Sequence, residues 1–139
     1  VSDIVTIKAE RTFWDKIVIL HGLRQWYDNR RQLRQNGHRV SRHYYDLYKL
    51  TNSSVGKNAL ADLELGSDSV RHARIYFNSN NLGLLNARPG TFTISPTPEM
   101  TEILNRDYKL MSGMIFGETP DFSDIIKSIW LLEDEINRN

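Results

Sequence analysis

Apolar side chains recur at helical spacing through much of the 139-residue chain. Three segments place residues at i, i+4, i+7 and i+11, the positions that share one face of an α-helix. They are Phe13, Ile17, Leu20 and Arg24; Leu104, Tyr108, Met111 and Ile115; and Ile125, Ile129, Leu132 and Ile136. Such a face stabilises a helix when it packs against other elements. The pattern therefore predicts a mainly α protein whose helices bury their apolar faces against one another.

Residues 1–139 are expected to form a single domain, a helical bundle-like fold of at least five helices with two short β-strands. The first strand is predicted at Val1–Lys8, because this segment is apolar and β-branched. The second is predicted at Thr91–Ile94, because its polar and apolar side chains alternate. Strands and helices do not alternate along the sequence, so a doubly wound parallel sheet is not expected.

Capping residues and glycines predict where the helices begin and end. The first helix is expected to begin at Thr12, with Asp15 completing a capping box, and to end before a polar loop over residues 27–40. Further helices are expected to begin at Ser41, at Val55, at Asp68 after a break near Gly66, at Pro98 behind the cap Thr97, and at Asp121 or Ser123.

Charge is balanced over the whole chain, with 18 Lys and Arg against 17 Asp and Glu, but not along it. Residues 24–49 hold seven basic and two acidic side chains, whereas residues 118–139 hold two basic and six acidic ones. A basic stretch of this kind attracts phosphates, nucleotides or nucleic acid. An ordinary solvated arginine-rich loop explains the same composition, so both interpretations stay open.

Several functional classes are excluded by what the sequence lacks. It contains no cysteine, which excludes a disulfide framework, a cysteine-based zinc site and a cysteine nucleophile. The longest strictly aliphatic run, Ile17-Val18-Ile19-Leu20, is far shorter than the roughly 18 residues of a membrane-spanning helix. Neither a phosphate-binding P-loop nor a dinucleotide fingerprint is present. No short motif therefore identifies an activity by itself.

Lys16 and Asp46 are the two positions that suggest chemistry. Lys16 stands in an apolar stretch, where its ammonium either reaches out to water or points at an anion. Asp46 shares a helix face with His43, three residues earlier, and this pair is compatible with metal binding. Beside Arg42, Asp46 is also compatible with a role as base or ligand, or with a plain surface ion pair. Tyr44, Tyr45 and Tyr48 nearby are explained by packing or by stacking on a nucleobase.

The order of several short motifs resembles the second half of the AbiEii/AbiGii-type nucleotidyltransferases, the toxins of type IV (abortive-infection) toxin–antitoxin systems. The resemblance covers nearly all 139 residues in consistent order. It rests on Glu10-Arg11-Thr12-Phe13-Trp14-Asp15-Lys16, Ser41-Arg42-His43-Tyr44-Tyr45-Asp46-Leu47, His72-Ala73-Arg74-Ile75-Tyr76-Phe77, Arg88-Pro89-Gly90-Thr91 and Met111-Ser112-Gly113-Met114-Ile115-Phe116-Gly117.

The resemblance implies a nucleotidyltransferase of the DNA-polymerase-β type and assigns roles to residues of this chain. Lys16 matches the family lysine that is expected to hold nucleotide phosphates. Asp46 matches the family aspartate, with an acid/base or structural role, and Arg42 is a phosphate or substrate contact. These residues are expected to lie on adjacent helices and to open on one cleft, with the 24–42 loop at its rim. RNA contacts are expected from Arg30, Arg31, Arg34 and Arg39.

The resemblance also implies partners and a missing part. In the family, a Gly-Ser segment and metal-binding acids lie in an N-terminal α/β half, and they were not found in this sequence. The chain is therefore expected to be the C-terminal part of a longer cytoplasmic enzyme, inactive alone and without a metal site of its own. The intact enzyme would use Mg²⁺ and an NTP, act plausibly on tRNA, have a cognate antitoxin, and have no membrane association. The alternative is a non-catalytic module that binds nucleic acid or an antitoxin.

Overall fold

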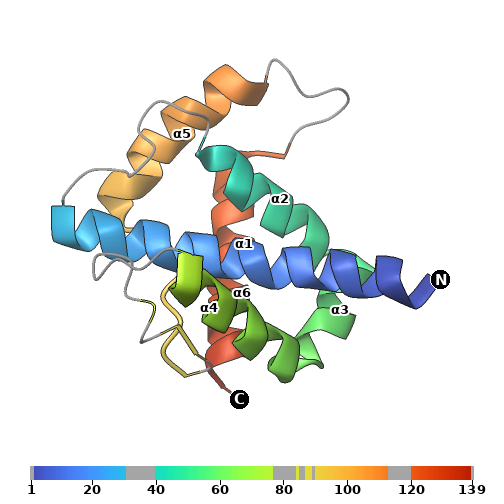
Figure 1. The fold of residues 1–139 in the computed structure, drawn as a ribbon. Coiled ribbons are helices and arrows are strands. Elements are labelled where there is room, and N and C mark those ends of the chain that lie inside the picture. The colour runs from blue at the N-terminus through green and yellow to red at the C-terminus, as the bar shows by residue number, and fades with distance from the viewer. Residues whose placement is uncertain are drawn as a thin grey trace.

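A computed structural model of the chain describes residues 2–30, 40–76, 84, 87–88, 90–112 and 120–138. Within these residues the elements are all helical: α1 (Ser2–Arg30), α2 (Ser41–Thr51), α3 (Ser54–Leu60), α4 (Leu63–Tyr76), α5 (Pro98–Ser112) and α6 (Phe122–Asn137). Figure 1 shows α1 crossing the middle of the molecule, with α2 and α5 above it and α3 and α4 below it. Helix α1 packs against α2, α3 and α4, while α6 packs against α2 and α5.

The predicted apolar stripes form the centre of the fold. Phe13, Ile17 and Leu20 of α1 are fully buried, and so are Leu104 of α5 and Ile125 of α6. The other inward positions expected on the last helix are also buried, namely Ile129, Leu132 and Ile136. The mainly α prediction is therefore confirmed for the described residues. None of the helices described is long and apolar enough to cross a membrane.

The strand predicted at residues 1–8 is wrong. Residues 2–8 are the first turns of α1, which begins ten residues before the expected start at Thr12. β-branched residues favour a strand only weakly. A strand also needs a neighbouring strand to pair with its backbone N–H and C=O groups. No described residue lies in a strand, so this segment instead continues the helix that follows it. Thr12 is consequently an interior residue of α1 rather than its cap.

The strand predicted at residues 91–94 is also wrong, although its alternating burial is correct. Phe92 and Ile94 are buried, but the backbone pairs with side chains instead of a neighbouring strand. The Phe92 N–H donates to Asn137 Oδ1 (3.1 Å), and the Asn137 amide donates back to the Phe92 carbonyl (2.9 Å). The Thr93 N–H donates to His21 Nδ1 (3.0 Å). Buried backbone groups need partners, and helices α1 and α6 supply them here.

Glu133 of α6 is the main acceptor for the same segment. Its Oε1 accepts from the N–H of Ile94 (2.7 Å) and of Ser95 (3.3 Å), and its Oε2 accepts from the Ser95 hydroxyl (2.8 Å). Glu133→Ala would leave these buried donors unpaired, at about 1–3 kcal/mol for a buried polar group. We expect the free energy of unfolding, measured in urea, to fall by about 2–3 kcal/mol.

Two matched variants make that measurement specific. Glu133→Gln keeps an acceptor oxygen and should retain most of the stability. Glu102→Ala removes an exposed carboxylate whose contact is an i,i+4 pair with Arg106, so its effect should stay below about 0.5 kcal/mol. Equal stability of the Glu133→Ala and Glu102→Ala proteins would contradict the role of Glu133.

Helix α2 begins at Ser41 as predicted, but the cap expected from Ser41 and the break expected near Gly66 are wrong. Ser41 does not cap α2 with its own hydroxyl: its N–H and its hydroxyl both donate to Asp107 Oδ2 of α5, at 2.9 and 2.6 Å. The expected break near Gly66 is absent, because α4 runs through it. A Cβ at Gly66 would lie 2.8 Å from Trp14 Cδ2, so this glycine permits close helix packing. Thr97 does cap α5, accepting from the Met100 N–H at 3.1 Å.

Candidate functional site

Lys16 of α1 and Asp46 of α2 form an ion pair. Lys16 Nζ lies 3.0 Å from Asp46 Oδ2, and the two side chains are 18% and 32% exposed. The pair arises because α1 and α2 pack side by side, which brings together residues from the two separate motifs. The prediction that these two residues lie on adjacent helices is therefore confirmed. Their partial burial makes the pair stronger than a fully solvated surface pair.

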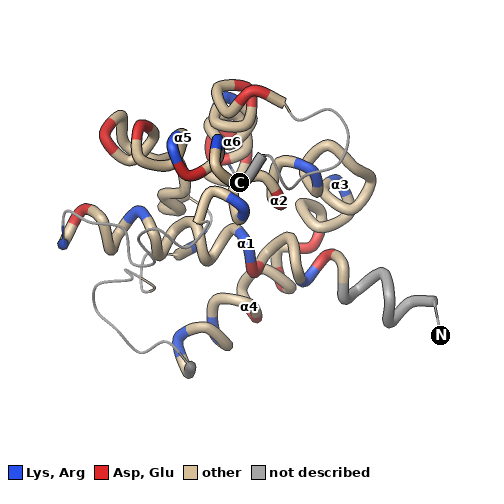
Figure 2. Tube along the Cα trace, turned by 90° about the horizontal axis from the view of Figure 1, so that it is seen from above, with Lys and Arg blue, Asp and Glu red and all other residues tan. Residues whose placement is uncertain are grey.

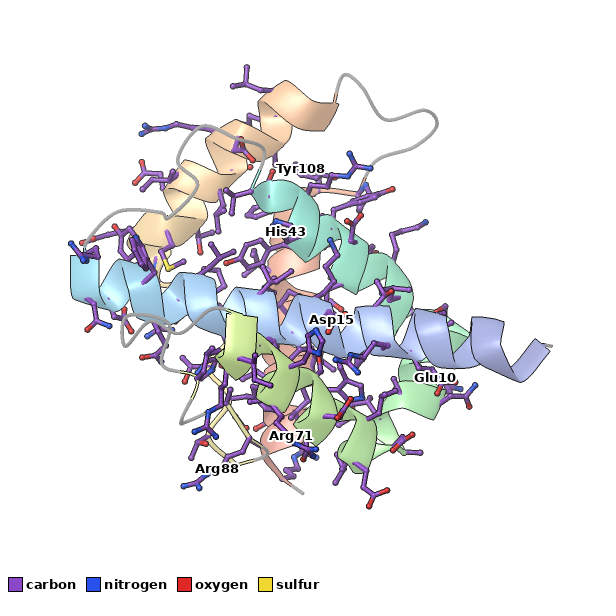
Figure 3. All side chains as sticks on the ribbon, in the orientation of Figure 1. Glu10, Asp15, His43, Arg71, Arg88 and Tyr108 are labelled. Atoms are coloured by element: carbon purple, nitrogen blue, oxygen red, sulfur yellow. The ribbon has the colours of Figure 1, made fainter. Side chains whose placement is uncertain are left out.

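His43 completes this arrangement, one helical turn before Asp46. Its Nδ1 lies 3.1 Å from Lys16 Nζ. In Figure 3, His43 lies on the first turn of α2, above α1. Burial lowers the pKa of His43, as do the cations Lys16 and Arg42, while Asp46 acts in the opposite direction. A lysine ammonium has only donors, so a hydrogen bond between the two groups needs an unprotonated Nδ1 as acceptor.

Arg42 lies at the edge of the site. Its Nε is 4.0 Å from Asp46 Oδ2, and its side chain is mostly exposed. Two cations thus surround one carboxylate at a partly exposed surface, and a ligand of negative charge is favoured there. Residues 31–39, which belong to the expected rim of the predicted cleft, lie outside the described residues.

The same charges disfavour a metal ion at His43 and Asp46. Among the described residues, no group of three or more His, Cys, Asp or Glu side chains is arranged to hold a metal. The Asp46 carboxylate already faces the Lys16 ammonium, which would repel a divalent cation at the same place. The described residues therefore fit an anion better than a metal. The chain does contain one Gly-Ser pair, Gly66-Ser67, but it lies inside helix α4, where Gly66 packs on Trp14. This pair therefore does not form a phosphate-binding turn and does not replace the Gly-Ser segment of the family.

The other acid of the first motif, Asp15, serves the packing of α1 against α4. It accepts hydrogen bonds from the Ser69 hydroxyl and from Arg11 Nε. Arg11 also bridges to Asp68 Oδ2 of α4 at 2.6 Å. Figure 3 shows Asp15 on α1 and Arg71 on α4 below it. One motif thus provides a lysine for one side of α1 and an anchoring acid for the other.

The predicted RNA-contact residues are only partly covered. Arg30 is exposed at the end of α1, with its guanidinium carbon 5.3 Å from the centre of the Trp26 ring. Arg31, Arg34 and Arg39 lie outside the described residues. Figure 2 shows basic and acidic positions interspersed over the helices rather than separated by sign. The RNA contacts therefore stay a prediction.

Sequence reasoning did not find the contact between His43 and Lys16, and it paired His43 only with Asp46. The sequence feature that could have indicated this contact is the i,i+3 spacing of His43 and Asp46, which puts both side chains on one face of α2. Which helix that face meets depends on packing. For the tyrosines, the packing interpretation suits Tyr44, which is fully buried against Phe122.

The Tyr44 hydroxyl is buried without a hydrogen-bond partner among the described residues. A buried unpaired hydroxyl costs about 1–3 kcal/mol. We therefore expect Tyr44→Phe to raise the free energy of unfolding by about 1 kcal/mol. Tyr108→Phe is the matched control: its hydroxyl donates to the Pro120 carbonyl at 2.7 Å, so the same change should lower stability. A loss of stability in both proteins would show that Tyr44 has a partner.

Comparison with protein families agrees with the motif order noted in the sequence. A family model described as "Nucleotidyl transferase AbiEii toxin, Type IV TA system" matches residues 1–128. Neither a curated protein nor a solved structure matches the chain. The family match covers both helices that carry the Lys16–His43–Asp46 cluster.

Proposed function

The chain belongs to the AbiEii family of nucleotidyltransferase toxins from type IV toxin–antitoxin systems. We propose that Lys16 and Arg42 bind the phosphates of a nucleotide substrate and that Asp46 positions Lys16 for this contact. The observation that carries this proposal is the position of the Lys16 ammonium. It is held between Asp46 Oδ2 and His43 Nδ1, at 3.0 and 3.1 Å, and is still partly exposed. Two of its three N–H groups have acceptors there, and the third, which has no acceptor among the described residues, is proposed to donate to a phosphate oxygen.

The chemistry of nucleotidyl transfer suits such a site. An acceptor hydroxyl attacks the α-phosphorus of an NTP, a new P–O bond forms, and the bond to the leaving pyrophosphate breaks. Catalysis of this kind depends mostly on positioning and on stabilising negative charge on the phosphates. Lys16 supplies a fixed positive charge and Arg42 a second one at the edge. Because Asp46 is already engaged by Lys16, we assign it the role of holding the lysine.

The remaining parts of the proposal concern the substrates and partners of the toxin. NTP and Mg²⁺ are the expected substrate and cofactor, the 3′ end of a tRNA is the proposed acceptor, and an antitoxin is the proposed partner in the cytoplasm. The described residues do not fit a metal ion, so their proposed work is to bind and orient the nucleotide. These 139 residues alone are expected to be inactive, and the assays therefore use the whole toxin.

The test is a labelling experiment. The toxin is incubated with cellular RNA and, in turn, with each of the four NTPs carrying a radioactive α-phosphate. Label at the 3′ end of an RNA is the expected result, and label on tRNA would support the proposed acceptor. RNA binding without any label from the four NTPs would overturn the proposal in favour of a non-catalytic nucleic-acid-binding module.

A further inference from the structure

We infer that His43 is a positioning residue, a neutral imidazole whose Nδ1 holds the Lys16 ammonium in place for the phosphate. The inference rests on the proposed function of Lys16 and adds a residue to it. The carrying observation is that α2 presents two acceptors to one lysine of α1. Asp46 Oδ2 lies 3.0 Å and His43 Nδ1 lies 3.1 Å from Lys16 Nζ.

Two acceptors define the position of an ammonium better than one. A single carboxylate leaves a flexible lysine free to rotate about it, because the ammonium is a compact charge on four rotatable bonds. A second acceptor one helical turn away fixes the direction of a second N–H. The third N–H then points away from α2. Small errors in the position of a catalytic group cost large factors in rate, so this constraint has a functional consequence.

The acceptor must be a neutral side chain for the site to keep its charge. A second carboxylate in place of His43 would neutralise Lys16 and Arg42 together and weaken the attraction for phosphate. The neutral imidazole satisfies an N–H of Lys16 without adding negative charge. Its tautomer is then defined: Nδ1 is unprotonated and Nε2 carries the hydrogen.

Protonation of His43 would reverse the arrangement. Nδ1 would become a donor facing another donor, and three cations would surround Asp46. The charged groups that face His43 are Lys16 from α1 and Arg42 and Asp46 from α2, while Asp107 of α5 binds Ser41 at the start of the same helix. Since the pKa of His43 is lowered below 6.5, the imidazole stays neutral at pH 7 and gains its proton only in more acidic solution.

The experiment measures nucleotide transfer by the whole toxin between pH 5 and 8. His43→Ala should lower the rate at pH 7 by about tenfold through loss of positioning. His43→Asn places an amide oxygen near the position of Nδ1 and cannot titrate. It should restore the rate to within about threefold of wild type and lack the fall in rate that we expect of wild type in acidic solution. A fall of the same shape in the His43→Asn protein would overturn the inference.

A spectroscopic measurement on the wild-type protein makes the test independent of activity. The ¹⁵N shifts of the wild-type histidines at pH 7.5, with the His43 signal identified by its absence from His43→Asn, report the tautomer. An unprotonated Nδ1 is expected, and a protonated Nδ1 would overturn the inference. If Lys16→Met loses transfer but His43→Ala keeps the wild-type rate, the inference fails while the proposed function stands. If Lys16→Met keeps its activity, the proposed function itself fails.

Discussion

Lys16→Met is expected to lower the rate of nucleotide transfer by about 100-fold or more. Methionine has nearly the length and volume of lysine but neither charge nor N–H donors, so the change removes the proposed phosphate contact and leaves the packing almost intact. Removal of one preorganised donor from a site that stabilises developing charge typically costs a factor of about 10²–10³ in rate. The measurement is the initial rate of label transfer by the whole toxin at saturating NTP.

Controls separate this effect from a general loss of structure. Lys49→Met makes the same change at an exposed position of α2, close to Asp46 in sequence, and should keep the wild-type rate. Lys16→Arg keeps the charge, but its planar guanidinium cannot occupy the same place between Asp46 and His43, so an intermediate rate is expected. Wild-type activity in the Lys16→Met protein would remove Lys16 from the site.

Trp14→Ala is expected to cause the largest loss of stability, about 3–5 kcal/mol. The Trp14 side chain is 1% exposed and lies where three helices meet. Its Nε1–H donates to the Ala59 carbonyl of α3 at 2.9 Å, and its ring lies against Gly66 of α4. It also packs on Phe92, with ring centres 6.2 Å apart. Truncation would leave a cavity and remove one hydrogen bond to the Ala59 carbonyl, which also accepts from the Asp62 N–H at 3.0 Å. A domain has a total stability of typically 5–15 kcal/mol, so this loss is a large fraction of it.

Urea unfolding followed by circular dichroism measures this effect. Trp14→Phe retains much of the ring volume but loses the hydrogen bond, and it should cost less than the alanine variant. Trp130→Ala is the matched control, because Trp130 is 57% exposed on α6, and its effect should stay within about 0.5 kcal/mol. Similar losses for Trp14→Ala and Trp130→Ala would show that the junction of α1, α3 and α4 is less important than its burial indicates.

The candidate site was partly predictable. The motif order singled out Lys16 and Asp46, and their adjacency is confirmed by the 3.0 Å ion pair. The contact of His43 with Lys16 was not predicted, because the two residues are 27 positions apart and meet only through the packing of α1 on α2. The roles of these residues in transfer stay predictions, as do the RNA contacts of Arg31, Arg34 and Arg39.

The sequence by itself determined that the chain is mainly α and which faces of the helices are buried. Both follow from the spacing of apolar residues over three to four positions, which is a local property of the sequence. Local patterns misassigned residues 1–8 and 91–94 as strands, since a strand exists only when a partner supplies its hydrogen bonds. Only the tertiary structure decided that side chains of α1 and α6 bind the extended segment, up to 72 positions away in sequence. The same holds for the two acceptors of the Lys16 ammonium, Asp46 Oδ2 and His43 Nδ1. Their positions depend on how α1 and α2 pack, and the sequence pattern does not specify that geometry.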